Sequence, residues 1–308
     1  MHHFLDVFPE ANAIPYGPTD WDGLYIDIYA WNGRRPYHSI NFVTAHDGFT
    51  MYDMFSYAEK QNECGLLNPI CCDDPYSAWC DTESGESHNR SYDWGMGQEH
   101  IKRQQMRNIF AGLFFSHGTP MILGGDEWMR TQYGNNNAYS TWSDNEWNWF
   151  RWGEWRSTTH NYRSRMHDYV RKLVSLRKQR EYAFAPTEYG GGMPFAWKSQ
   201  HNGDPDWAGR LMMIHYYDDG GWDEPELAVL INLTPSETSF TLPEGRDWSR
   251  ILDTRAELDL DGTGDEPDGY FNSNPDADRR ASANIAPAEL TGGSYSMAAF
   301  TIAILEER

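Results

Sequence analysis

Two short apolar segments of the sequence are each followed by acidic residues. His46 and Asp47 come directly after the apolar segment Ile40–Ala45, while Asp126 and Glu127 come after the apolar tripeptide MIL and two glycines. Such segments are typical of the buried strands of a parallel sheet. These side chains could act on a substrate, or they could cap a loop or the next segment.

The segments between and after these strands favour parallel β/α units. Apolar residues recur at helical spacing from Glu99 to His117, and the helix is expected to end at Gly118. The tripeptide Met121–Leu123 is the second predicted strand, and a second helix is predicted from about Tyr162 to Arg180. Strand, helix, strand, helix is the order of parallel β/α units.

After Glu181 the pattern changes to short strands separated by turn residues. We therefore predict two domains, a β/α domain over residues 1–180 and an antiparallel β-sandwich over residues 181–308. The predicted strands of the sandwich are Phe195–Lys198, Leu211–Tyr217, Leu227–Leu233, Thr238–Leu242, Arg250–Leu252 and Met297–Leu305.

Charge and composition exclude several classes of partner. The 308 residues carry 25 Lys and Arg against 46 Asp and Glu, a formal net charge of -21, which disfavours binding to nucleic acid or to an anionic membrane surface. An aromatic content of 15% is too high for a disordered acidic chain. No apolar run has the length of a membrane span, and residues 1–10 lack the pattern of a signal peptide. We expect a folded protein, with the cytoplasm as the favoured location.

Two polar stretches leave alternatives open. Four cysteines in one stretch could form disulfides, remain reduced, or bind a metal together with His88, of which the metal is least favoured. The stretch Asp259–Gly269 is read as a solvated turn in preference to a calcium loop. The cysteines are Cys64, Cys71, Cys72 and Cys80.

Several motifs together resemble one family. NFVTAHDG at Asn41–Gly48, GGDEWMRT at Gly124–Thr131 and NNNAY at Asn135–Tyr139 resemble the second half of an isoamylase-type debranching enzyme of the α-amylase superfamily. HNRSYDWG at His88–Gly95 and TLPEGRDWSRILDT at Thr241–Thr254 are similar to the same family. The similarity covers most of the chain.

The resemblance implies an α/β plus all-β fold, the C-terminal part of a TIM β/α barrel followed by an antiparallel β-sandwich. Ile40–Ala45 would be the seventh barrel strand and Met121–Leu123 the eighth. Members of the family are glycoside hydrolases that cleave the α-1,6 branch linkages of glycogen or amylopectin with retention. Retaining hydrolysis uses a nucleophilic carboxylate and a proton-donating carboxylic acid about 5 Å apart.

The resemblance also assigns roles to individual residues. Asp47 would be a third acid that stabilises the positive charge of the transition state, and His46 would bind a hydroxyl of the same sugar. Asp126, Glu127 and Asn136 are expected to bind substrate. Five tryptophans of one loop could be sugar platforms or could pack that loop: Trp142, Trp147, Trp149, Trp152 and Trp155.

The family carries its nucleophile and proton donor after strands four and five, and those motifs do not occur before Ile40. We therefore expect a truncated or split debranching enzyme, inactive without its upstream half, whose two strands and helices are unstable alone. Its expected partners are a branched α-glucan (glycogen, amylopectin or maltodextrin) and an N-terminal complementing fragment, with no cofactor and no metal. The alternative is a noncatalytic glucan-binding or scaffold protein derived from such an enzyme.

Overall fold

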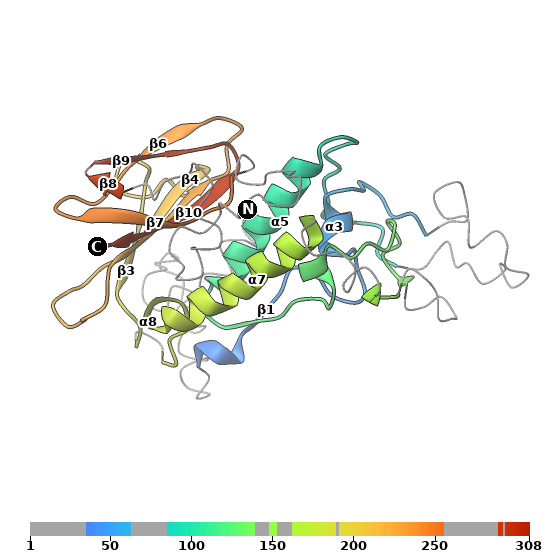
Figure 1. Ribbon diagram of the computed structural model, residues 1–308, viewed down its shortest axis with the longest axis horizontal. Coiled ribbons are helices and arrows are strands. Elements are labelled where there is room, and N and C mark those ends of the chain that lie inside the picture. The colour runs from blue at the N-terminus through green and yellow to red at the C-terminus, as the bar shows by residue number, and fades with distance from the viewer. Residues whose placement is uncertain are drawn as a thin grey trace, which may run out of the picture.

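The computed structural model describes residues 35–62, 85–138, 148–152, 162–188, 191–255, 289–291 and 293–308. In Figure 1 the helices α5 (Glu99–Phe114) and α7 (Tyr162–Gln179) lie between a sheet-rich part and the loops around the short helix α3 (Met51–Met54). The four cysteines and the stretch Asp259–Gly269 lie outside the described residues. None of the helices in these ranges combines the length and the hydropathy of a membrane span.

Two short strands form a parallel pair. β1 (Ile40–Asn41) pairs with β2 (Thr119–Pro120), and Ile40 lies opposite Thr119. The prediction of a strand over Ile40–Ala45 buried on both faces is wrong, because Ile40 is 62% and Phe42 52% exposed. The second strand precedes the predicted Met121–Leu123. Within the described ranges no further strand lies beside this pair, and its ladder is two residues long.

The helix α5 ends at Phe114, three residues before the predicted end at His117. An arginine of α7 donates hydrogen bonds to carbonyl groups at and after this C-terminus. Arg177 donates hydrogen bonds to the carbonyl oxygens of Phe114, Ser116 and Gly118 at 2.5, 2.7 and 2.6 Å. The last carbonyl groups of a helix have no partner within the helix, and a cation there also opposes the negative end of the helix dipole. One side chain therefore satisfies the end of α5 and joins the two helices.

The sheet-rich part is antiparallel throughout, as the strand pattern predicts. β3 (Phe195–Lys198), β4 (Leu211–Tyr216), β5 (Leu227–Asn232), β10 (Thr301–Glu307), β7 (Asp247–Asp253) and β8 (Glu289–Thr291) form one sheet in that spatial order. β6 (Thr238–Thr241) and β9 (Ser294–Met297) form a separate antiparallel pair. The predicted strand Met297–Leu305 is therefore two strands, separated by a turn in which Phe300 has a φ of 51°.

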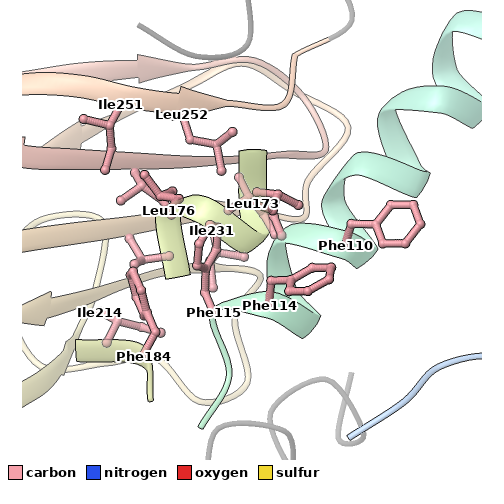
Figure 2. Close-up of a cluster of buried hydrophobic side chains, with 14 of the residues drawn as sticks. Phe110, Phe114, Phe115, Leu173, Leu176, Phe184, Ile214, Ile231, Ile251 and Leu252 are labelled. Atoms are coloured by element: carbon pink, nitrogen blue, oxygen red, sulfur yellow. The ribbon is translucent and has the colours of Figure 1, made fainter. Parts of the chain in front are cut away.

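The two faces of the six-stranded sheet belong to different apolar clusters. On β5, Leu227, Val229 and Ile231 pack with the helices, whereas Ala228 and Leu230 pack with residues of β6 and β9. This alternation follows from the two-residue period of a strand. Figure 2 shows the cluster on the helical side of the sheet. Its side chains come from α5 and the residue that follows it, from α7, from α8 (Glu181–Phe184) and from the sheet: Phe110, Phe114, Phe115, Leu173, Leu176, Phe184, Ile214, Ile231, Ile251 and Leu252.

A row of polar side chains on α5 also binds the sheet. Gln104 and Asn108 donate to the carbonyl oxygen of Phe300 at 2.8 and 2.6 Å, and Arg107 donates to that of Thr254 at 3.2 Å. Together with the shared core, these contacts join α5 to the sheet-rich part, so the helices that we expected to be unstable alone pack against it. They cross the predicted boundary at residue 180, and the division into 1–180 and 181–308 stays a prediction.

Two methionines provide a matched test of this core. Met106 on α5 is fully buried, whereas Met96 is 98% exposed. We expect Met106→Ala to lower the free energy of unfolding by roughly 2–5 kcal/mol, because the change removes buried surface and leaves a cavity. Met96→Ala should stay within about 0.5 kcal/mol of the wild type. Urea denaturation followed by circular dichroism measures both, and equal midpoints would contradict this packing.

Candidate active site

The loop between β1 and α3 carries His46 and Asp47 at the protein surface. The loop is anchored on both sides of these residues, since Thr44 and Thr50 are buried. The carboxylate of Asp47 makes no hydrogen bond or ion pair with another described residue. The two predicted site residues are therefore adjacent and open to solvent at the carboxyl end of β1.

Asp126 lies beneath this loop and binds it on both sides of the exposed residues. Its Oδ2 accepts a hydrogen bond from Thr44 Oγ1 at 2.5 Å, and its Oδ1 accepts one from the backbone N–H of Met51 at 2.9 Å. Met51 is the first residue of α3, where a backbone N–H has no partner within the helix. Burial raises the pKa of Asp126 to about 6, although these two hydrogen bonds act in the opposite direction.

Asp53 makes the reciprocal contact. This fully buried residue of α3 accepts hydrogen bonds from Thr131 Oγ1 at 2.5 Å and from the backbone N–H of Gln132 at 2.7 Å. Thr50 caps the same helix, because its hydroxyl oxygen accepts from the Asp53 N–H at 3.2 Å. Burial raises the pKa of Asp53 to about 6. Sequence reasoning missed Asp53, although the spacing Thr50-x-x-Asp53 is a helix-start signal.

Arg130 supplies positive charge near both carboxylates. Its guanidinium lowers the pKa of Asp126 by Coulomb attraction, and Asp126 and Asp53 oppose the lowering of the pKa of Arg130 that burial causes. Gly125 permits the close approach of Arg130. It has a φ of 99°, and a Cβ placed there would lie 2.9 Å from Arg130 Cδ. A side chain at residue 125 would therefore displace the arginine.

Glu127 and Asn136, which we also expected to bind substrate, make hydrogen bonds within the protein. Glu127 Oε2 accepts from the N–H of Gly125 at 2.9 Å, within the turn that precedes η3 (Asp126–Trp128). Asn136 is buried, donates to Asn89 Oδ1 at 2.9 Å and accepts from Asn62 at 3.0 Å. A direct sugar contact from Asn136 does not fit this arrangement, because its amide is committed to the loop contacts.

Asp126 needs the same correction. It has 0% exposure, and each of its oxygens accepts a hydrogen bond from the protein. We expected it to bind substrate, but no surface of the carboxylate is open to one. A buried structural acid and a substrate-binding acid look the same in the sequence, because each follows an apolar segment.

The aromatic loop is described only in part. Trp149 and Trp152 are exposed, and the ring of Trp152 lies 4.6 Å from that of Phe150, centroid to centroid. Trp142, Trp147 and Trp155 lie outside the described residues. Across the described ranges, no group of three or more His, Cys, Asp or Glu side chains is arranged to hold a metal ion.

Comparison with known proteins relates this chain to isoamylases. The chain is 30% identical to isoamylase 1 of Oryza sativa subsp. japonica over 292 residues, 91% of this chain and 32% of that protein. It is 32% identical to isoamylase SU1 of Zea mays over 76% of this chain and 28% of that protein. The glycogen operon protein GlgX homolog of Mycobacterium tuberculosis is 46% identical over 41% of this chain and 16% of that protein. No family model matches the chain.

Solved structures show the same relationship at the level of the fold. Pullulanase from Paenibacillus barengoltzii has a TM-score of 0.56 at 19% identity, over 97% of this chain and 33% of that chain. Pullulanase from Bacillus acidopullulyticus has a TM-score of 0.53 at 17% identity, over 98% of this chain and 28% of that chain.

The sequence is thus similar to isoamylase-type debranching enzymes. More specifically, its resemblance to the C-terminal part of an isoamylase-type debranching enzyme is confirmed. The chain spans about a third or less of the length of these relatives.

The two buried carboxyl groups should make stability depend on pH. Between pH 4 and pH 6 the folded protein keeps protons that the unfolded chain has lost, because the folded pKa values of Asp53 and Asp126 are about 6. Each group therefore lowers the free energy of unfolding as pH rises through this window, by on the order of 1–3 kcal/mol. Asp126→Asn removes one of these contributions, so the variant should gain stability relative to the wild type from pH 4 to pH 7.

Urea denaturation at several pH values measures this difference. Asp204→Asn, at an exposed position of the β3–β4 loop, is the matched control and should show no such trend. A constant difference between Asp126→Asn and the wild type across the window would contradict the burial of a titrating carboxyl group.

Proposed function

We propose that this chain carries the seventh and eighth strands of a catalytic β/α barrel in β1 and β2, followed by a C-terminal β-sandwich. The proposed enzyme cleaves the α-1,6 branch linkages of an α-glucan with retention. One observation carries the proposal: within the isoamylase-like motif, the structure presents His46 and Asp47 together at the surface after β1.

Asp47 has the role of a transition-state stabiliser in this proposal. The transition state of glycoside hydrolysis spreads positive charge over the sugar ring, and a carboxylate beside it raises the rate. His46 binds a hydroxyl of the same sugar. The nucleophile and the proton donor are two further carboxyl groups, and the family motifs that carry them do not occur before Ile40. The chain alone is therefore proposed to be inactive.

The surface of the β1–β2 pair supports a need for more barrel. Ile40, Phe42, Val43 and Met121 are large apolar side chains that remain exposed on and beside these strands. Parallel strands are ordinarily covered on both faces. The backbone of β1 bonds β2 through the carbonyl groups of Ser39 and Asn41, so the groups of Ile40 face the opposite edge. A further parallel β/α segment, in the same chain or as a complementing fragment, would cover these groups.

The substrate class follows from the relatives. One group of relatives is named as glycogen operon proteins, and one solved pullulanase structure is complexed with maltotetraose. We propose glycogen, amylopectin or maltodextrin as the substrate of the complete enzyme. The same relatives, all much longer than the aligned part, are the natural source of an upstream half for reconstitution.

Reconstitution tests the proposed function. The chain is joined to the part of rice isoamylase 1 that precedes the aligned region, and the release of reducing ends from amylopectin is measured. We expect turnover by the joined protein and none by the chain alone. Asp47→Asn should lower kcat by roughly 10²–10³-fold or more with little loss of glucan binding, because the interaction strengthens in the transition state. Asp204→Asn, the same change at a distant exposed site, should leave kcat unchanged.

Three results would count against this proposal. Hydrolysis of pullulan by the purified chain alone would show that the missing carboxylates are present after all. Unchanged turnover in Asp47→Asn would remove its proposed role. Binding of amylopectin without turnover in the joined protein would favour a noncatalytic glucan-binding protein.

A further inference from the structure

We infer that Asp126 and Asp53 are a reciprocal pair of positioning residues that fix the His46–Asp47 loop. Each carboxylate reaches from the segment after one parallel strand into the segment after the other. The catalytic consequence rests on the proposed function, whereas the positioning itself does not. This replaces the substrate-binding role expected for Asp126.

Asp126 accepts hydrogen bonds from the loop on both sides of its exposed residues, His46 and Asp47. Thr44 comes two residues before His46, and Met51 comes four residues after Asp47. Both donate to the one buried carboxylate, through Thr44 Oγ1 to Oδ2 and Met51 N–H to Oδ1. Thr44 and Met51, the two ends of this loop segment, are therefore held together by hydrogen bonds to one carboxylate group.

Asp53 accepts hydrogen bonds from the segment that carries Asp126. Thr131 Oγ1 donates to its Oδ1 and the Gln132 N–H to its Oδ2, directly after η3. Asp126 belongs to η3, and Asp53 belongs to α3, which begins at Met51. Displacement of either segment would therefore strain the hydrogen bonds of the other.

The geometry of both carboxylates limits them to this role. Asp53 and Asp126 have 0% exposure, and each of their four oxygens accepts a hydrogen bond from the opposite segment. The titratable groups that face them are Arg130, which attracts both, Glu127, which acts on Asp126, and Tyr57, whose pKa Asp53 raises. A substrate reaches neither carboxylate, so their contribution passes through the loop that they hold.

Amide hydrogen exchange on the chain as it stands tests the positioning. Thr44→Val keeps the shape of the side chain and removes the donor to Asp126. We expect the amide of Met51, which donates to the same carboxylate, to exchange about tenfold faster or more, because hydrogen bonds to a charged group are strong. Thr44→Ser keeps the hydroxyl and should exchange within about twofold of the wild type. Thr241→Val, on the exposed face of β6, should leave this segment unchanged.

The amides of α5 report whether each variant remains folded. If Thr44→Val does not fold, Thr131→Val removes the donor to Asp53 and should accelerate the amide of Gln132 in the same way. Unchanged exchange in a folded Thr44→Val or Thr131→Val variant would overturn the inference.

Turnover in the joined protein tests the catalytic consequence. Thr44→Val should lower kcat about tenfold or more while KM changes less than about threefold, and Thr44→Ser should restore kcat. A purely structural role would lower the amount of folded enzyme and would leave the kcat of the folded fraction unchanged. Faster exchange without a change in kcat would overturn the catalytic part alone. A joined wild-type protein without turnover would reject the proposed function, and the exchange result would still decide the positioning.

Discussion

Two carboxyl groups buried between the loops at the strand ends constrain this part of the molecule. A buried carboxylate is costly unless donors replace its hydration, and Asp53 and Asp126 each receive two hydrogen bonds from the opposite segment. The donors include backbone N–H groups of Met51 and Gln132, so the course of the chain itself is fixed. A shift of either segment would leave a charge without partners, which gives the loops one favoured arrangement.

This arrangement is tied to the sheet through the helices. Asn41 of β1 donates to the carbonyl oxygen of His117 at 2.5 Å, directly after α5. Arg177 joins the same end of α5 to α7, and Gln104 joins the helix to the turn before β10. The helices α5 and α7 thus pack against the six-stranded antiparallel sheet. The contact of Asn41 after the end of α5 holds β1, and the contact of Gln104 within α5 holds the sheet.

The sequence predicts well the elements whose pattern is local. Helical spacing finds α5 and α7, and the pattern of short strands between turn residues finds β3 with its observed bounds. Patterns fail where distant partners decide the outcome. Ile40–Ala45 is apolar enough for a buried strand, but burial needs neighbours that cover it, and only β2 pairs with this segment among the described residues. The turn at Phe300 is hidden within an apolar run, because its φ of 51° is set by the paths of β9 and β10.

The candidate site shows the same limit at the level of single residues. The motif finds His46 and Asp47, and the structure leaves both exposed. It cannot separate Asp47 from Asp126, since both are acids that follow an apolar segment. Burial separates them. A group that stabilises positive charge must carry a negative charge, and burial opposes ionisation, as the pKa of about 6 at Asp126 shows.

The division of roles follows from this difference. Asp126 gives up solvent contact to hold Thr44 and Met51, so its charge acts on the protein. Asp47 stands on the loop that these contacts hold and is exposed, so in the proposed enzyme its carboxylate is open to a substrate. The buried acid is therefore proposed to position the loop and the exposed acid to act on the substrate, because both oxygens of Asp126 already accept hydrogen bonds from the protein.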